Sequence, residues 1–222
     1  LYAQGNIVSG TGAANIQDKY MVDQIEKLRK DEDIKAVVFR INSGGGSAYA
    51  SEQIWKAITD LKKEKPVVVS MGDVAASGGY YIACNADRIV AQPTTLTGSI
   101  GIFGMIPNME GTAEKVGIST DVVKTNEFGD FGNITRPFND QEKQLMQNMI
   151  ERGYDLFLTR CAEGRNMPKD SLALYAEGRV WTGNQAKEIG LVDELGSIER
   201  AIEIAAEMAN LGKSYVVFEY PK

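Results

Sequence analysis

Two glycine-rich segments and one serine have the clearest chemical potential in this sequence. The first segment, residues 42–47, contains three consecutive glycines, and the second, Ser77-Gly78-Gly79, follows two alanines. Each lies between a predicted strand and a predicted helix, which brings their backbone N–H groups to one edge of a sheet, near helix N-termini. Two converging N–H groups can hold the negative charge that develops when the Ser77 hydroxyl attacks a carbonyl.

Each feature taken alone has a plainer interpretation, because glycines serve tight turns and Ser77 can cap a helix. The sequence contains no histidine, which excludes a Ser-His-Asp triad, a Cys-His dyad and any zinc site with histidine ligands. The first loop lacks the lysine and spacing of a phosphate-binding loop, and neither loop has a complete dinucleotide fingerprint. We therefore expect a nucleophilic serine with a base other than histidine, and neither a cofactor nor a metal.

Length and composition indicate which broad class of protein this chain belongs to. With 222 residues, 43% of them hydrophobic, we expect one α/β domain over 1–222 with a helical C-terminal extension from about 140 to 222. The net charge of −6 gives no basic surface for nucleic acid. No run approaches the roughly 20 apolar residues that span a membrane. The start at Leu1, without methionine, indicates a piece of a longer protein whose membrane anchor lies outside it.

Hydrophobic patterns predict alternating strands and helices, which is typical of a mostly parallel sheet. We expect strands near residues 5–9, 36–41, 66–70, 88–91, 121–124 and 215–219. We expect helices through residues 21–28, 54–61, 140–163 and 197–211, a short apolar helix after Ser77-Gly78-Gly79, and a loop over 125–137. Of the two cysteines, Cys84 lies in an apolar run and is interpreted as a buried thiol. Cys84 and Cys161 could form one disulfide, but nothing in their spacing argues for it.

Longer motifs carry a resemblance to a known family. They read I-N-S-G-G-G-S at 41–47 and D-V-A-A-S-G-G-Y-Y at 73–81, with further blocks at 96–101, 178–183 and 186–196. With these, most of the chain resembles signal peptide peptidase A. The resemblance implies the α/β fold of the Clp protease and crotonase-like superfamily, a superhelix of repeated β-β-α units with a mostly parallel sheet.

The resemblance also implies roles for individual residues. Ser77 would be the nucleophile, the backbone amides of Gly45 and Gly78 would be the oxyanion donors, and Ser99 would orient the base. Gly44 stands where the family usually has proline, a departure that loosens the first loop without moving the donors.

The expected general base is absent. A lysine base must be neutral, so its pKa must fall from about 10.4 by roughly 3 units, which only a buried lysine achieves. Compact family members carry this lysine in the loop after the strand matching 121–124, one residue before an aspartate, and here Gly129 holds that position. Lys124 is interpreted as a solvated edge residue. Double-length members resemble tandem repeats with the lysine on the first half, so we expect this chain to be a C-terminal half whose own N-terminal repeat supplies the lysine.

The resemblance implies a serine endopeptidase of the cell envelope that degrades remnant signal peptides or other extended apolar peptides. It implies a homo-oligomer, membrane-anchored with the catalytic domain extracytoplasmic, while the fragment itself is soluble and inactive or weakly active. Two alternatives stay open. In a crotonase-like acyl-CoA enzyme the glycine amides would stabilise a thioester enolate, and in an inert half they would be relics within a peptide-binding or assembly module.

Overall fold

The chain folds into two compact units. The computed structural model describes residues 1–12, 14–212 and 214–220. The first unit comprises residues 1–101 and 156–222, and the second comprises residues 102–155. Helix α5, Asp140–Arg165, begins in the second unit and ends in the first.

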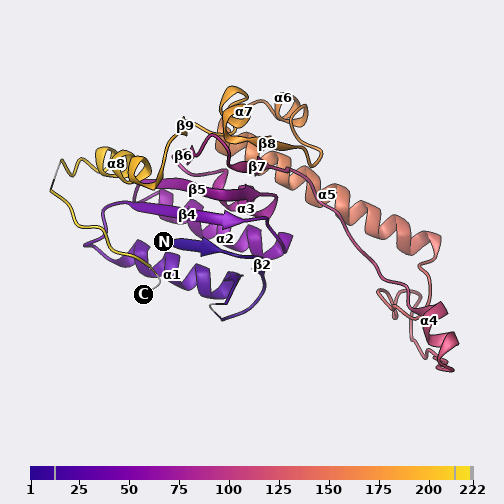
Figure 1. The fold of residues 1–222 in the computed structure, drawn as a ribbon. Helices are drawn as coiled ribbons and strands as arrows, with labels where there is room; N and C mark the ends of the chain where they lie inside the picture. Colours follow the sequence, from indigo (N-terminus) through magenta and orange to yellow (C-terminus); the bar gives the residue numbers. More distant parts are fainter. Residues whose placement is uncertain (13, 213, 221–222) are drawn as a thin grey trace. The chain divides into compact units, whose positions relative to one another are not determined.

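The first unit alternates strands and helices (Figure 1). Its strands are β1 Tyr2–Gln4, β2 Ile7–Val8, β3 Ile16–Gln17, β4 Val37–Ser43, β5 Val67–Ala76, β6 Arg88–Ala91, β7 Leu96–Gly98, β8 Val180–Thr182 and β9 Glu194–Leu195. Its helices are α1 Asp18–Lys30, α2 Ala48–Lys62, α3 Gly78–Ala83, α6 Lys169–Ala173, α7 Gly183–Glu188 and α8 Ile198–Met208, together with the end of α5. The second unit holds α4 Glu110–Lys115, the start of α5 and long connecting loops.

The main sheet confirms the predicted mostly parallel α/β arrangement. Its described strands follow the order β1-β4-β5-β6-β9, and β7 pairs with both β5 and β8. Every pair on the main path is parallel, as is β5 with β7, and only β7 with β8 is antiparallel. The carboxyl ends of β4, β5 and β7 therefore point the same way.

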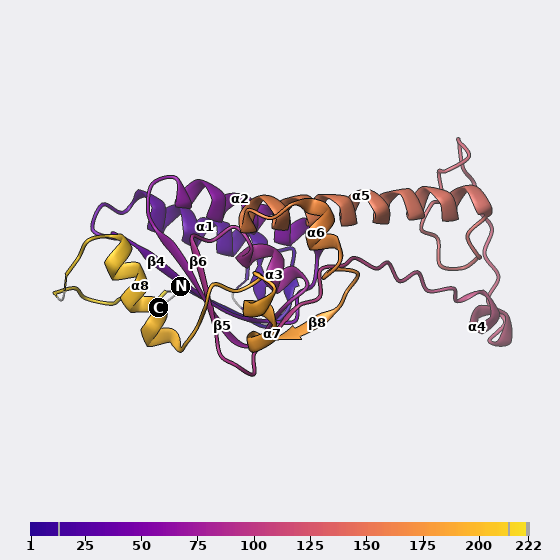
Figure 2. The same cartoon turned by 90° about the horizontal axis from the view of Figure 1, so that it is seen from above.

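Helices cover both faces of this sheet. In Figure 2, α1 and α2 lie on one side of β4 and β5, and α8 lies on the other. Residues Val67 to Met71 of β5 are all buried, as expected for a strand covered on both faces. One face of the sheet packs in a cluster of Val68 and Val90 against Ala201, Ile204 and Ala205 of α8. This packed sheet is the rigid base that supports the loops at its carboxyl edge.

Two predicted strands are wrong. Residues 121–124 and 215–219 are not strands, although both are rich in residues with high β-propensity. Val123 is 97% exposed, so its segment lacks the neighbour on which strand stability depends. The tail is tied to β1 by a hydrogen bond from the Tyr2 N–H to the Tyr220 carbonyl, 2.9 Å long, but forms no ladder.

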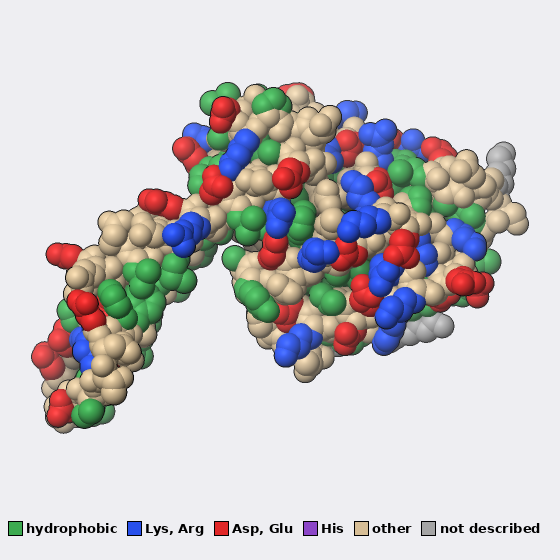
Figure 3. All heavy atoms as spheres, turned by 180° about the vertical axis from the view of Figure 1, so that it is seen from behind, with side chains coloured by type: hydrophobic (Ala, Val, Ile, Leu, Met, Phe, Trp, Pro, Cys, Tyr) green, Lys and Arg blue, Asp and Glu red, His purple; other side chains and the backbone are tan. Residues whose placement is uncertain are grey.

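Charge is dispersed over the first unit. Figure 3 shows Lys and Arg side chains interspersed with Asp and Glu over the face in view. The described residues contain no helix long and apolar enough to cross a membrane. They also contain no cluster of three or more Cys, Asp and Glu that could hold a metal ion.

Candidate active site

Ser77 occupies a sharp turn between β5 and α3. Its backbone has φ 52° and ψ −121°, a conformation that costs a residue with a side chain about 1–3 kcal/mol. Hydrogen bonds hold the turn on both sides, because the Ser77 N–H donates to the Gly98 carbonyl and the Tyr81 N–H donates to the Ser77 carbonyl, each 2.9 Å long. A strained strand-to-helix turn of this kind presents a nucleophilic serine in many hydrolases.

The two glycine loops meet beside Ser77, as the sequence predicts. Gly45 has φ +99°, and a Cβ placed on it would lie 2.5 Å from the Gly78 nitrogen and 2.9 Å from the Ser77 Cβ. A Cβ placed on Gly78 would lie 2.6 Å from the Ser51 Oγ and 3.2 Å from the Gly46 nitrogen. Distances below 3.0 Å are essentially never seen for a real Cβ, so a side chain at Gly45 would clash with backbone and one at Gly78 would force Ser51 aside. The two backbones therefore approach one another as converging oxyanion donors must.

The two predicted donors differ in their hydrogen bonding. The Gly45 N–H donates to the buried Ser43 Oγ over 3.0 Å. Within the described residues, the Gly78 N–H has no acceptor, as expected at the first position of a helix. The Gly78 N–H is thus available to an acceptor from a substrate, and the Gly45 N–H is already occupied. Ser43 was not among the predicted site residues, although a serine two residues before a glycine in a turn often accepts that glycine's N–H.

Asn42 shapes the strand that leads to Ser77. The register between β4 and β5 shifts between Ile41 and Ser43, and the Asn42 Oδ1 accepts a hydrogen bond from the Val74 N–H at 3.1 Å. A Cβ on Gly72 would lie 3.0 Å from the Asn42 side chain. Where the register shifts, the Asn42 side chain takes the place of a backbone partner for β5. Strand β5 therefore continues to Ala76, although we expected it to end at Ser70.

Ser99 emerges beside Ser77. Strands β5 and β7 are parallel, with Ala76 opposite Gly98, so the next residue of each strand is a serine. Ser99 also has a positive φ, 49°, and its N–H donates to the Arg179 carbonyl at 2.7 Å. Within the described residues of the first unit, no side chain hydrogen-bonds to the hydroxyl of Ser77 or Ser99. Four of the five predicted site residues thus belong to this unit.

The fifth, Gly129, lies in a loop of the second unit. A Cβ on Gly129 would lie 3.1 Å from the Lys124 Cβ, so Lys124 is the lysine beside the expected position of the base. Its Nζ donates to the Glu127 carbonyl at 3.0 Å and pairs with the Asp130 Oδ1 at 2.8 Å. The ammonium is held by two partners in its own loop, and the segment that carries it is not the edge strand we expected.

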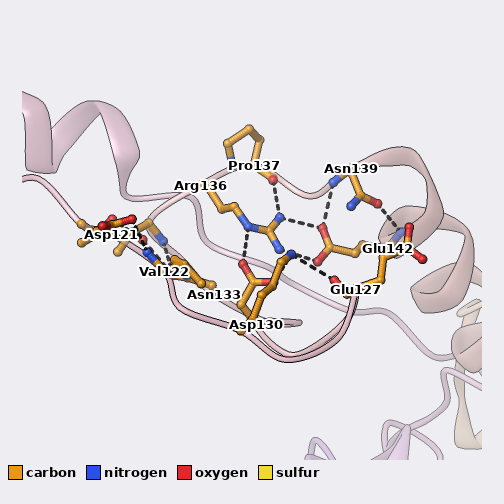
Figure 4. Close-up of polar contacts among 12 residues, drawn as sticks. Asp121, Val122, Glu127, Asp130, Asn133, Arg136, Pro137, Asn139 and Glu142 are labelled. Atoms are coloured by element: carbon orange, nitrogen blue, oxygen red, sulfur yellow. Dashed lines mark hydrogen bonds and ion pairs between the residues drawn. The ribbon is translucent and has the colours of Figure 1, made fainter.

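A network of ion pairs closes the same loop (Figure 4). Arg136 lies between Asp130 and Glu142, donating to the former at 2.8 Å and to both oxygens of the latter at 2.7 and 2.6 Å. Arg136 and then Lys124 hold the pKa of Asp130 well below its usual range. Arg136 also lowers the pKa of Glu142 to about 2. Reciprocal bonds between Asn139 and Glu142, 2.9 and 2.8 Å long, form a capping box at the start of α5.

Side-chain contacts fix α3, the helix that follows Ser77, to its neighbours α2 and α5. The Tyr81 hydroxyl donates to Glu52 of α2, which also pairs with Arg160 of α5 at 2.7 Å. The Arg160 guanidinium lies 4.0 Å from the centre of the Trp55 ring, a cation–π contact. Both cysteines are free and buried, confirming the interpretation of Cys84.

Comparisons with known proteins find proteases among the proteins that this chain resembles. The profile of peptidase family S49 matches residues 59–212, and that of Clp protease matches residues 1–101. Protease 4 of Salmonella typhi is 43% identical over 213 residues, covering 95% of this chain and 34% of that protein. The chloroplastic serine protease SPPA of Arabidopsis thaliana is 39% identical over 205 residues, covering 92% of this chain and 30% of that protein. The chain thus spans about a third of the length of these two relatives.

A solved structure confirms the predicted fold. A mutant of ClpP1 from Listeria monocytogenes superposes with a TM-score of 0.63 at 16% identity, covering 91% of this chain and 93% of that one. The fold is therefore of the Clp protease type, as the family resemblance implies.

Proposed function

Because this chain belongs to peptidase family S49, we propose that it is the nucleophile-bearing part of a serine endopeptidase. The observation that carries the proposal is the strained turn at Ser77, placed against the backbones of Gly45 and Gly78. In this mechanism Ser77 attacks a peptide carbonyl and the two amides bind the oxyanion. The C–N bond then breaks, the leaving amine takes the proton that the base accepted from Ser77, and water hydrolyses the acyl-enzyme. Ser99 orients the base that takes the proton from Ser77.

We propose further that a lysine outside this chain is that base. Gly129 holds the position of the expected lysine, and Lys124 is committed to Glu127 and Asp130. Protease 4 is about three times as long as this chain, which leaves room for a second repeat bearing a lysine. The proposed partner is therefore the protein's own N-terminal repeat.

Substrates and setting follow from the family. Extended apolar peptides, remnant signal peptides among them, are the proposed substrates, and the cell envelope is the proposed location, with the membrane anchor outside this chain. Assembly into a homo-oligomer is supported by exposed apolar side chains of the second unit (Figure 3). The most exposed of them are Phe103, Met105, Val116, Ile118 and Val123.

The acyl-CoA alternative has less support. Stabilising a thioester enolate needs the paired amides but neither a strained serine at position 77 nor a second one at position 99.

An inert peptide-binding half would have no reason to keep the strain at Ser77, whose cost is about 1–3 kcal/mol.

Labelling with a fluorophosphonate tests the proposal. We expect the full-length protein to react and its Ser77→Ala variant to remain unlabelled, while Ser119→Ala, which alters an exposed serine of the second unit, labels normally. The isolated chain should label weakly or not at all. Strong Ser77-dependent labelling of the isolated chain would place the base within these residues, and equal labelling of wild type and Ser77→Ala would refute Ser77 as nucleophile.

A further inference from the structure

The hydroxyl of Ser43 lies beneath the junction of the two glycine loops. Ser43 is the last residue of β4, is 3% exposed and pairs with Ala75 of β5. A Cβ placed on Gly79 would lie 2.6 Å from the Ser43 carbonyl oxygen and 3.4 Å from its Cβ. The backbone of Ser43 is therefore fixed between β5 and the first turn of α3, and its main freedom is rotation about χ1.

The hydrogen bond from Gly45 to Ser43 competes with the proposed oxyanion hole. A backbone N–H has one hydrogen, and that of Gly45 is directed at the Ser43 Oγ. The Gly78 N–H, by contrast, has no acceptor among the described residues. In this state the site offers a substrate carbonyl one open donor, and the second becomes available only when the Ser43 hydroxyl gives it up.

We propose that Ser43 is a positioning residue that occupies the Gly45 amide in the resting site and yields it to the oxyanion during catalysis. The inference rests on the proposed function of Ser77. When a neutral substrate carbonyl replaces the Ser43 hydroxyl as the acceptor of the Gly45 amide, little free energy is gained, because the two hydrogen bonds are of similar strength. When an oxyanion replaces the Ser43 hydroxyl, more free energy is gained, since a charge-assisted hydrogen bond is about twice as strong as a neutral one. Ser43 thereby cancels the contribution of the Gly45 amide to substrate binding, while the amide still stabilises the transition state relative to the bound substrate.

This competition predicts a specific kinetic signature. In Ser43→Ala the Gly45 amide is free before substrate binds. The bound substrate and the transition state are therefore stabilised by the same additional free energy relative to the free enzyme. Such uniform binding lowers KM without changing kcat. We expect KM to fall by about threefold to tenfold, the size of one neutral hydrogen bond, with kcat within about twofold of wild type. Ser43→Cys, whose sulfur is a weak acceptor, should be intermediate.

The experiment measures hydrolysis of a fluorogenic apolar peptide by the full-length protein, with thermal melting as the check on folding. Ser51→Ala is the matched control, because the Ser51 Oγ is also buried beside Gly78 but donates to the Ser47 carbonyl at 2.9 Å. It should not lower KM. A lower kcat in both Ser43→Ala and Ser43→Cys, or an unchanged KM, would overturn the inference and leave Ser43 as a loop anchor.

The two proposals fail in different ways. If Ser77→Ala leaves hydrolysis intact, the proposed function is wrong whatever Ser43 does. If hydrolysis depends on Ser77 but KM does not fall in the Ser43 variants, only the competition for the Gly45 amide is refuted.

Discussion

Adjacent glycines in the first loop should respond to alanine in opposite ways. A Cβ on Gly45 would lie 2.5 Å from the Gly78 nitrogen, and Gly45 has φ +99°. At Gly44, by contrast, no described atom lies within 4 Å of the Cβ position, and its φ is not in the positive range. Gly45→Ala therefore introduces both strain and a clash with backbone, whereas Gly44→Ala introduces neither.

The cost of Gly45→Ala follows from these two effects. A positive φ costs alanine about 1–2 kcal/mol, and overpacking against backbone that cannot move aside costs about 1–3 kcal/mol. The sum of about 2–5 kcal/mol corresponds to a melting temperature lower by about 4–20 °C in a protein of this size. Gly44→Ala should leave the free energy of unfolding unchanged or raise it by about 0.4–1 kcal/mol, because alanine restricts the unfolded chain.

The effect on reactivity separates packing from catalysis. Any shift that relieves the clash moves the Gly45 and Gly78 amides apart, and loss of one oxyanion donor lowers the rate by about a hundredfold or more. The assay is fluorophosphonate labelling of the full-length protein well below the melting temperature of each variant. If Gly45→Ala melts lower yet labels at the wild-type rate, Gly45 serves packing alone. Equal losses in Gly44→Ala would refute the geometry of the loop.

Three further predictions address the base, the second unit and the thiols. In the isolated chain, Gly129→Lys should create or increase Ser77-dependent labelling, and unchanged labelling would refute the assignment of that position to the base. Arg136 lowers the pKa of Glu142 from 4.5 to about 2, so their ion pair should stabilise the fold above about pH 4.5 and lose this contribution as the pH falls towards 2. Melting temperatures of wild type and Glu142→Gln should therefore converge in acid, and a constant difference would contradict the pairing. Burial raises the pKa of the Cys161 thiol, so an aromatic disulfide reagent at about pH 8, near the ordinary thiol pKa, should react only after unfolding.

Sequence reasoning succeeded where the parallel sheet decides the geometry. Residues at the carboxyl ends of parallel strands meet at one edge, so the approach of the Gly45 loop to Ser77 and Gly78 could be predicted from the alternation of strands and helices. The role of Ser99 came only from the family resemblance, because the strand that precedes it was not predicted. Sequence reasoning failed at 121–124, because strand propensity says nothing about whether a partner strand is present.

The side-chain hydrogen bonds at the site could not be predicted from the sequence either. The extension of β5 to Ala76 depends on the Asn42 amide, which bonds to the Val74 N–H. The state of the Gly45 amide depends on a single rotamer of Ser43. Neither leaves a periodic signal, since each is one hydrogen bond made by one polar residue in a short loop.

Backbone strain indicates the same site without reference to any relative. Among the described residues other than glycine, five have a positive φ: Ser77, Ser99, Asn166, Glu177 and Asn210. Asn166 and Asn210 follow the ends of α5 and α8, where a left-handed residue commonly closes a helix. Ser77 and Ser99 instead follow the adjacent strands β5 and β7, where extended backbone would cost nothing. The two strained serines side by side are what the proposed pair, a nucleophile and the residue that orients its base, would require.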